Sequence, residues 1–341
     1  MMKKGILLFA ALLVCIIGLA GCGSQNSSSD LPEEVKIGYL RVPNDEMVSK
    51  TKDLFDAYFS ELGISYEFII FDSGAEANQA LASGSIDFAS MGNTNAIIAL
   101  ARGIDVEMIW IHEVLGEIEG LAVKEGSGIM TAQDLVGQKI ATPFASTSHY
   151  ILLNYLKENG IADQVELLDM PTADIVAAWE RGDINAAYTW QPSLGELTKT
   201  GSILVDSADM AEEGYITANV LLVQKEFSSN YPDLVAGFIK VLSQGGDIYR
   251  ADAQEAADSV ATELAITSDQ ALSQMSGSIW LTPEEELSEE YMGTSDSPGH
   301  FAQIMKDTAD FLAEQKSIDS APSQEAFNEY LNPLYIEMSL E

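Results

Sequence analysis

The sequence predicts an α/β fold of two lobes, in which mixed, mainly parallel sheets are joined by a two-strand hinge. From residue 35 onward, strand-like and helix-like apolar patterns alternate, which is typical of parallel sheets with crossover helices. A ten-residue segment near position 80 is echoed about a hundred residues later. Two apolar segments a similar interval apart could carry the chain out to a second lobe and back.

The first elements follow from apolar periodicity and from glycines that end helices. Gly63 ends a helix expected at 46–62, and Gly84 ends one expected at 75–83. The strands expected between these helices are 35–40, 66–71 and 86–90, and another helix begins near Asn93.

The remaining elements are a strand expected at 106–111 and a largely helical segment from Phe227 onward. Pro232 and Pro283 stand where proline favours the first turn of a helix. The acidic stretch 284–290 is interpreted as a solvated helix face.

The near-repeat consists of residues 80–89 and 178–187. Both copies have the end of a helix, a glycine that reverses the chain and a strand that leads into a loop. Connections of a helix, a glycine and a strand are common in proteins, so the similarity of the two segments could also arise by chance. The alternative that we favour is two lobes of similar plan, whose loops 91–95 and 188–192 face one cleft.

The hinge is expected at residues 119–124 and 219–225, two apolar stretches that each end in lysine. On this interpretation the first lobe comprises 35–121 and 223–341, and the second lobe comprises 122–222.

The N-terminal residues are typical of an export signal. Lys3 and Lys4 precede an apolar run at 6–20, which is too short for a membrane-spanning helix. The run ends in Leu-Ala-Gly-Cys at 19–22, which resembles the lipobox of bacterial lipoproteins. That resemblance implies a signal peptide at 1–21, a lipid anchor on Cys22 and a polar tether at 22–34, with the protein on the outer face of the cytoplasmic membrane or in the periplasm. An ordinary secretory signal with an incidental cysteine is the alternative.

Composition excludes several classes of function. The chain has 341 residues and a formal charge of −36, so it lacks the basic face that nucleic-acid binding needs. Its two cysteines are Cys15, inside the signal, and Cys22, so the segment beyond them has no thiol for a disulfide, a nucleophile or a metal site. The three histidines are scattered, and no common catalytic or nucleotide-binding motif is present. We therefore expect no enzyme activity, no cofactor and no metal.

Binding of a small anion is better supported by the sequence than catalysis is. Three polar segments, at 72–74, 92–95 and 145–150, follow strands and precede helices. Ligands collect at such positions in open α/β sheets, and helix N-termini offer unpaired N–H groups to an anion. The candidate ligand-binding residues from these segments are Ser73, Gly74, Asn93, Thr94, Ser146, Thr147 and His149. The alternative is that the polar side chains only cap their helices.

Two further features concern the walls of the cleft. Trp190 follows the strand of the second repeat and is expected to line the cleft rather than the core. Glu113, Glu117 and Glu119 follow or surround Gly116, and one of them could pair with an ammonium group of a ligand. Otherwise these three belong to a solvated loop.

Four motifs together resemble the taurine-binding proteins of ABC importers, a family that includes binders of aliphatic sulfonates. They are Phe-Asp-Ser-Gly at 71–74, Gly-Asn-Thr at 92–94, Pro-Phe-Ala-Ser-Thr-Ser-His-Tyr at 143–150 and Ala-Trp-Glu-Arg-Gly-Asp-Ile at 178–184. The resemblance implies a type II periplasmic-binding-protein fold that closes on taurine or a related alkanesulfonate and delivers it to a permease and its ATPase. It also implies that Glu119 occupies an acidic ligand-binding position, whereas Asn219 stands where the taurine binders carry Asp. We expect a monomer.

Three alternatives to a taurine binder remain at the sequence level. The ligand could be another small anion, such as a sulfonate without an amine, because the amide of Asn219 forms no ion pair. The chain could be an enzyme related to the thiamine-pyrimidine synthases of this fold, although those use cleft cysteines. It could also be a sensory or adhesive lipoprotein without a permease.

Overall fold

The computed structural model describes residues 31–341. The signal peptide at 1–21, Cys22 and most of the expected tether lie outside these residues. Within 31–341, none of the helices combines the length and apolar character needed to cross a membrane.

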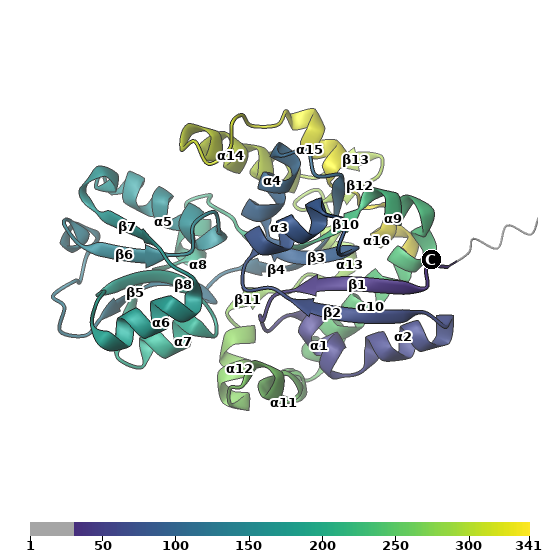
Figure 1. Cartoon of the computed structure of the whole chain (residues 1–341), viewed down its shortest axis with the longest axis horizontal. Helices are drawn as coiled ribbons and strands as arrows, with labels where there is room; N and C mark the ends of the chain where they lie inside the picture. The colour runs from purple at the N-terminus through teal and green to yellow at the C-terminus, as the bar shows by residue number, and fades with distance from the viewer. Residues whose placement is uncertain (1–30) are drawn as a thin grey trace, which may run out of the picture. The chain divides into compact units, whose positions relative to one another are not determined.

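The first lobe is built on a six-stranded sheet with the strand order β11-β4-β10-β3-β1-β2 (Figure 1). β1 pairs in parallel with β2 and β3, whereas β10 runs antiparallel to both β3 and β4. The strands of this sheet are β1 (Glu34–Tyr39), β2 (Ser65–Ile70), β3 (Phe88–Gly92), β4 (Val106–Leu115), β10 (Ala218–Gln224) and β11 (Ser278–Ile279).

The second lobe is built on a five-stranded sheet with the order β7-β6-β8-β5-β9. β6 pairs in parallel with β7 and β8, whereas β5 runs antiparallel to β8 and β9. The strands are β5 (Glu119–Lys124), β6 (Lys139–Thr142), β7 (Glu166–Asp169), β8 (Ala186–Trp190) and β9 (Gly201–Asp206), and a separate hairpin is formed by β12 (Gly293–Thr294) and β13 (Ser297–Pro298).

The two sheets share one plan, as the near-repeat predicts. β3 and β8 each lie between a parallel and an antiparallel neighbour, and each follows a helix that ends before a glycine with positive φ, Gly84 at 67° and Gly182 at 78°. The sheets are therefore mixed, and the fold class predicted from the sequence is confirmed.

Helices cover both sheets (Figure 1). In the first part of the chain they are α1 (Asp45–Thr51), α2 (Leu54–Leu62), α3 (Gly74–Ala82), α4 (Asn93–Ala101), α5 (Thr147–Glu158), α6 (Thr172–Arg181), α7 (Ser193–Thr198) and α8 (Ser207–Glu212). The C-terminal helices are α9 (Lys225–Asn230), α10 (Pro232–Ala251), α11 (Ala253–Leu264), α12 (Ser268–Met275), α13 (Pro283–Glu286), α14 (Phe301–Glu314), α15 (Gln324–Tyr330) and α16 (Leu334–Ser339). Two short 3-10 helices are η1 (Ala132–Leu135) and η2 (Ala162–Gln164).

The single helix expected at 46–62 is wrong, because Asp53 adopts a left-handed backbone, with φ of 57°, and divides it into α1 and α2. The two halves pack in different places. Met47 of α1 belongs to a cluster with α11 and α12, whereas Phe55 of α2 packs in the main core of the first lobe. A straight helix could not reach both clusters, and Asp tolerates the left-handed conformation better than most residues.

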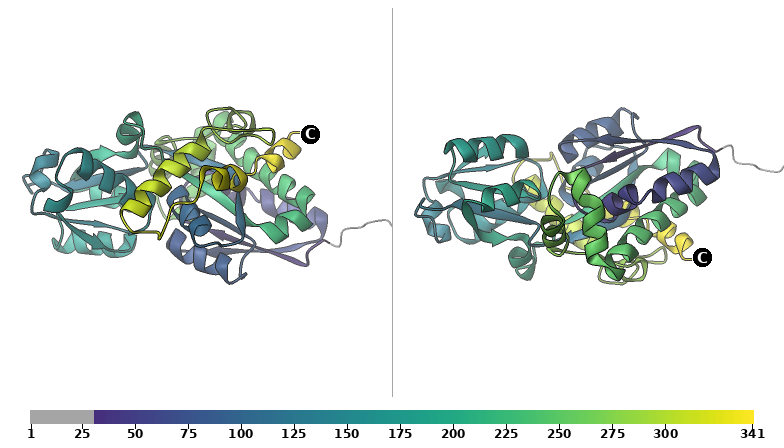
Figure 2. Two further views of the ribbon diagram at one scale, coloured as in Figure 1. Left: turned by 90° about the horizontal axis from the view of Figure 1, so that it is seen from above. Right: turned by 90° about the horizontal axis from the view of Figure 1, so that it is seen from below.

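The chain passes between the sheets at residues 116–118 and 213–217. β5 lies entirely in the second sheet and β10 entirely in the first, so the boundaries expected at 121/122 and 222/223 fall inside strands. The two crossing segments lie side by side at the edge of the first sheet, where the N–H of Leu115, the last residue of β4, donates to the Thr217 carbonyl at 2.8 Å. A further link is α14 of the first lobe (Figure 2), whose Phe311 packs edge-on against Tyr150 of α5.

Candidate functional site

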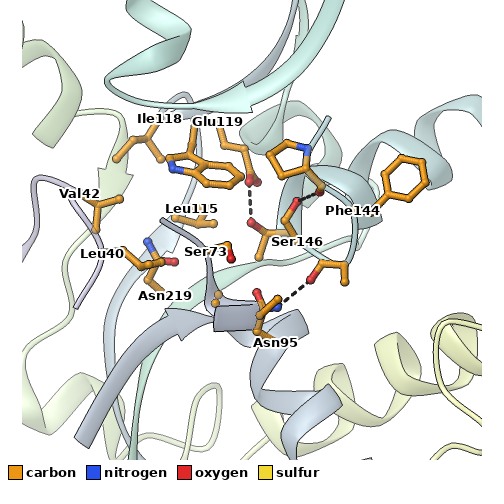
Figure 3. A pocket seen from close by; sticks show the side chains of 17 residues that line it. Leu40, Val42, Ser73, Asn95, Leu115, Ile118, Glu119, Phe144, Ser146 and Asn219 are labelled. Carbon is orange, nitrogen blue, oxygen red and sulfur yellow. Dashed lines mark hydrogen bonds between the residues drawn. The ribbon is translucent and has the colours of Figure 1, made fainter. Parts of the chain in front are cut away.

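A pocket lies between the lobes, where the N-termini of α3 and α5 approach each other (Figure 3). Its empty volume is about 550 Å³, including the space at its mouth. Its apolar lining consists of Leu40, Val42, Ala75, Leu115, Ile118, Pro143, Phe144, Ala145 and Trp190. Its remaining lining consists of Ser73, Gly74, Gly92, Asn95, Ser146, Thr147, Glu119 and Asn219.

The first lobe contributes the start of α3. The Ser73 hydroxyl oxygen caps this helix by accepting from the Glu76 N–H, at 3.3 Å. Within the described residues the first-turn N–H groups of Gly74 and Ala75 have no protein acceptor, as expected at a helix N-terminus. A side chain at position 74 would meet Asn95, because a Cβ there would lie 2.6 Å from Asn95 Oδ1. This end of α3 therefore presents bare backbone donors to the pocket.

The second lobe contributes the start of α5. The Ser146 hydroxyl group accepts from the His149 N–H and donates to the Pro143 carbonyl, so its donor and acceptor bonds are both made to the backbone within three residues. His149 lies behind the pocket rather than in its lining. Its ring stacks on Phe144 with centroids 4.3 Å apart, and burial lowers the pKa of its imidazole to about 4. His149 is thus a neutral support for the loop.

Asn93 and Thr94 do not line the pocket. Both are fully buried at the start of α4, and the Asn93 side chain accepts from the Ala218 N–H at 3.4 Å. Asn95, which follows them and was not among the candidates, lines the pocket instead. Its Nδ2 donates to the Ala145 carbonyl at 2.9 Å, which joins the first lobe to the second.

Glu119 lines the pocket, but its carboxylate faces a ring of hydroxyl groups. Oε1 accepts from Thr147, at 2.5 Å, and from Ser148, while Oε2 accepts from Ser207, at 2.8 Å. The residue is 1% exposed, and burial raises the pKa of its carboxyl. Its carboxylate therefore fixes the start of α5 rather than standing open to a ligand.

Trp190 and Asn219 also line this pocket. Trp190 is the last residue of β8 and faces Glu119 across the strand pair. Asn219 lies in β10 between Gly92 of β3 and Glu113 of β4. Glu113 is fully buried in β4, whereas Glu117 is exposed, so the solvated-loop interpretation holds only for Glu117.

Much of the apolar lining was missed by the sequence analysis. Leu40, Val42, Leu115 and Ile118 stand at strand ends or in the crossing segment, where apolar residues are usually assigned to the core. Phe144 lies in the 143–150 motif, and that position was the available signal for it. In residues 31–341, no group of three or more acidic, histidine or cysteine side chains is arranged to hold a metal ion.

Comparisons with known proteins place these features in a family context. The model of the NMT1/THI5-like family matches residues 56–256. The taurine-binding periplasmic protein of Escherichia coli K12 is 30% identical over 296 residues, which cover 85% of this chain and 89% of that protein. A putative aliphatic sulfonates-binding protein of Bacillus subtilis 168 is 31% identical and covers 75% of this chain and 77% of its own length.

Solved structures share the fold. The periplasmic aliphatic sulphonate-binding protein SsuA from Escherichia coli superposes with a TM-score of 0.70 at 22% identity, covering 87% of this chain and 92% of its own. The desulfurization enzyme DszB also superposes, with a TM-score of 0.67 at 17% identity, and the match covers 91% of this chain and 99% of that enzyme. The fold therefore hosts both binding proteins and an enzyme.

Proposed function

This chain belongs to the NMT1/THI5-like family, and we propose that it is an extracytoplasmic substrate-binding protein that captures taurine or a closely related alkanesulfonate. It then delivers this ligand to the permease and ATPase of an ABC importer. The relatives that are at least 30% identical are described as binding taurine or aliphatic sulfonates, which supports this class of ligand.

The observation that carries the proposal is the convergence of two helix N-termini, one from each lobe, on a single pocket. A sulfonate is ionised at physiological pH and has three oxygens, so N–H and hydroxyl donors at helix N-termini suit it. The pocket lining contains no lysine or arginine among the described residues. Backbone dipoles thus supply the positive end inside a protein of formal charge −36.

The apolar side of the pocket supports a ligand with a short carbon chain. Leu40, Val42 and Trp190 surround the space beside the polar residues, so the methylene groups of an alkanesulfonate would leave water there. Inorganic sulfate has no such part and would gain nothing from these walls.

A binding role is favoured over catalysis. The pocket lining includes neither cysteine nor histidine, and Glu119 is engaged by three hydroxyl groups. We propose that the protein works as a monomer tethered to the outer face of the membrane by a lipid on Cys22, which would keep it near its permease. The lipobox-like sequence at 19–22 supports the anchor.

Isothermal titration calorimetry tests the proposal with taurine, ethanesulfonate and inorganic sulfate as ligands. We expect saturable binding of at least one sulfonate and weaker binding of sulfate, because only the sulfonates fill the apolar side. The absence of heat for every sulfonate would overturn the proposed function. Tighter binding of sulfate than of either sulfonate would reassign the pocket to an inorganic anion.

A further inference from the structure

The side-chain amide of Asn219 is held on one side by a hydrogen bond to a buried carboxyl group. Its Nδ2 donates to Oε1 of Glu113 on the neighbouring strand β4, at 2.5 Å. An ionised carboxylate can only accept a hydrogen bond, so the ionised form of Glu113 holds the nitrogen of the amide against it. The atom that remains for the pocket is Oδ1, an acceptor (Figure 3).

This acceptor lies apart from the helix N-termini of the pocket. The starts of α3 and α5 offer donors, and Glu119, the carboxylate in the pocket lining, already accepts from three hydroxyl groups. The pocket therefore has helix N-termini that suit an anionic group and, in Asn219 Oδ1, an acceptor with the Glu113 carboxyl group directly behind it.

Glu113 itself is poised to respond to a charge placed at that acceptor. It is fully buried, and its second oxygen, Oε2, has no partner within the described residues. Burial raises the pKa of its carboxyl to about 8, against the opposing effects of His112 and of the Asn219 amide. A group with that pKa changes its ionisation state readily when a cation approaches.

The charged groups around Glu113 come from three elements. His112 is its neighbour on β4, and its imidazole contacts Asp45 of α1 at 2.6 Å. Glu46 of α1 accepts from Ser90, whose hydroxyl also contacts His112. Glu286 of α13 accepts from the Ile111 N–H at 2.9 Å. None of these four side chains contacts Asn219, so Glu113 alone connects the buried cluster to the pocket.

We propose that Glu113 is a positioning residue that makes the Asn219 end of the pocket selective for a ligand carrying a cationic nitrogen, because it orients the Asn219 carbonyl oxygen toward that nitrogen and places a buried carboxyl group directly behind it. The inference rests on the proposed function and deepens it, since it selects aminated sulfonates over amine-free ones.

The proposal links ligand binding to a proton. An ammonium group at Asn219 favours the ionised form of Glu113 and lowers the pKa of its carboxyl, so a proton leaves the protein on binding. The affinity for an aminated ligand then rises with pH until the pH passes about 8, the pKa of Glu113 without ligand. An amine-free sulfonate gains nothing from this ionisation.

The experiment compares taurine with ethanesulfonate, which differs from it only by the amino group, in calorimetric titrations of the wild-type protein between pH 6 and 8.5. We expect the ratio of the two affinities to rise about tenfold in favour of taurine, the change that one unit of pKa shift produces. Titrations repeated in buffers of different ionisation enthalpy should show that the protein releases a proton when it binds taurine and none when it binds ethanesulfonate.

The variant Glu113→Gln separates charge from shape, because its amide oxygen can still accept from Asn219 while the titrating group is gone. It should remove the pH dependence of the ratio. The matched control is Glu286→Gln. Glu286 is an equally buried carboxyl with a free oxygen and has no contact with Asn219. In this control variant the ratio of the taurine affinity to the ethanesulfonate affinity should still rise with pH.

A wild-type ratio that does not change with pH would overturn the inference even if Glu113→Gln fails to fold. A control variant that flattens the ratio as much as Glu113→Gln would also overturn it, since the whole cluster would then be responsible. Failure of the wild type to bind either sulfonate would instead count against the proposed function.

Discussion

At the scale of single residues, the aromatic wall of the pocket depends on Trp190. Its indole stands at the end of β8, where the strand leaves the second sheet, and it is only partly buried. A ligand that covers the rest of this ring removes apolar surface from water. Trp190 should therefore contribute to affinity more than to the stability of the fold.

We expect Trp190→Ala to weaken sulfonate binding by about 1–3 kcal/mol, the range for burial of a large apolar side chain, as measured by calorimetry. The control is Trp280→Ala, because Trp280 packs on Tyr249 with ring centroids 4.1 Å apart and lies outside the pocket. That variant should lower the melting temperature and leave the affinity within about twofold. Unchanged affinity of Trp190→Ala would contradict a role in the ligand wall.

The helix N-termini of the pocket could be predicted from the sequence more closely than the individual residues on them that face the pocket. Ser73 and Thr147 line the pocket, since a polar residue at a strand end or first helical turn can be found from the pattern alone. Asn219 also lines the pocket, but it was predicted only through the family resemblance. For α4 the prediction named Asn93 and Thr94, whereas Asn95 lines the pocket. The rotation of a helix about its axis decides which of three successive polar residues faces a ligand, and the tertiary packing of α4 sets that rotation.

The role of Glu119 also could not be read from the sequence. Its hydroxyl partners come from α5 and α8, which lie 28 to 88 residues further along the chain. A carboxylate near a cleft looks the same in sequence whether it faces a ligand or three serine and threonine side chains. Only the fold shows that this one holds the start of α5.

At the scale of elements, the contact between α4 and α5 brings the lobes together over the pocket. Asn95 donates to the Ala145 carbonyl across this contact. Gly92, which precedes α4, lies against Thr147, so that a Cβ at position 92 would be 2.8 Å from Thr147 Cγ2. The backbone of Gly92 has φ of −63° and ψ of 145°, which any residue adopts. Glycine is therefore needed here for close approach and not for its conformational freedom.

We expect Gly92→Ala to weaken sulfonate binding by about 1–3 kcal/mol, the usual cost of overpacking, because the added methyl group opposes this contact between the lobes. Small-angle scattering should show less compaction with saturating ligand than the wild type shows. Calorimetry gives the affinity, and thermal unfolding checks that the first lobe remains intact.

The double variant Gly92→Ala/Thr147→Ser tests the assigned clash. Serine lacks Cγ2 but keeps the hydroxyl group that donates to Glu119, so it should recover most of the lost affinity. If Thr147→Ser brings no recovery, the methyl group added at position 92 acts elsewhere. Normal affinity in the single variant would mean that binding does not need the α4–α5 contact.

Some features of the helices and strands could be predicted from the sequence and others could not. The glycines that follow helices, Gly63, Gly84 and Gly182, all adopt positive φ, and the segment repeated around two of them forms corresponding strands. The break at Asp53 was missed because its cause is tertiary: α1 and α2 pack on different clusters. The crossing points between lobes were also displaced, since an apolar strand looks the same in either sheet.

At the scale of the whole molecule, the buried cluster beneath the pocket sets the direction in which pH changes stability. Burial raises the pKa of Glu46 to about 7 and that of Glu113 to about 8, and it also raises the pKa of Glu286 well above the usual range of a glutamic acid. These carboxyls hold protons more tightly in the folded chain than in the unfolded one. Their contribution to stability is therefore lost as the pH rises from about 4.5 through their folded pKa values.

His112 acts in the same direction. The pKa of its imidazole rises to about 9, because the nearby carboxylates of Asp45, Glu46 and Glu113 outweigh the effect of burial. Its contribution is complete below about pH 6.5, the ordinary pKa of histidine, and is lost as the pH rises through 9. Exposed carboxylates are ionised throughout the range from pH 6 to 9, so they add little to any change there.

The melting temperature should consequently fall by a few degrees between pH 6 and pH 9, since a loss of about 1 kcal/mol lowers it by roughly 2–4 °C in chains of about 150–250 residues and by less in longer ones. Differential scanning calorimetry at constant ionic strength measures this slope. Glu46→Gln should make it shallower, because its amide oxygen can still accept from Ser90 while a group that titrates near pH 7 is removed. A melting temperature that rises with pH would contradict this account of the cluster, because the folded state would then bind fewer protons than the unfolded chain. A slope that Glu46→Gln leaves unchanged would also contradict it, because the protons would then be held by other groups.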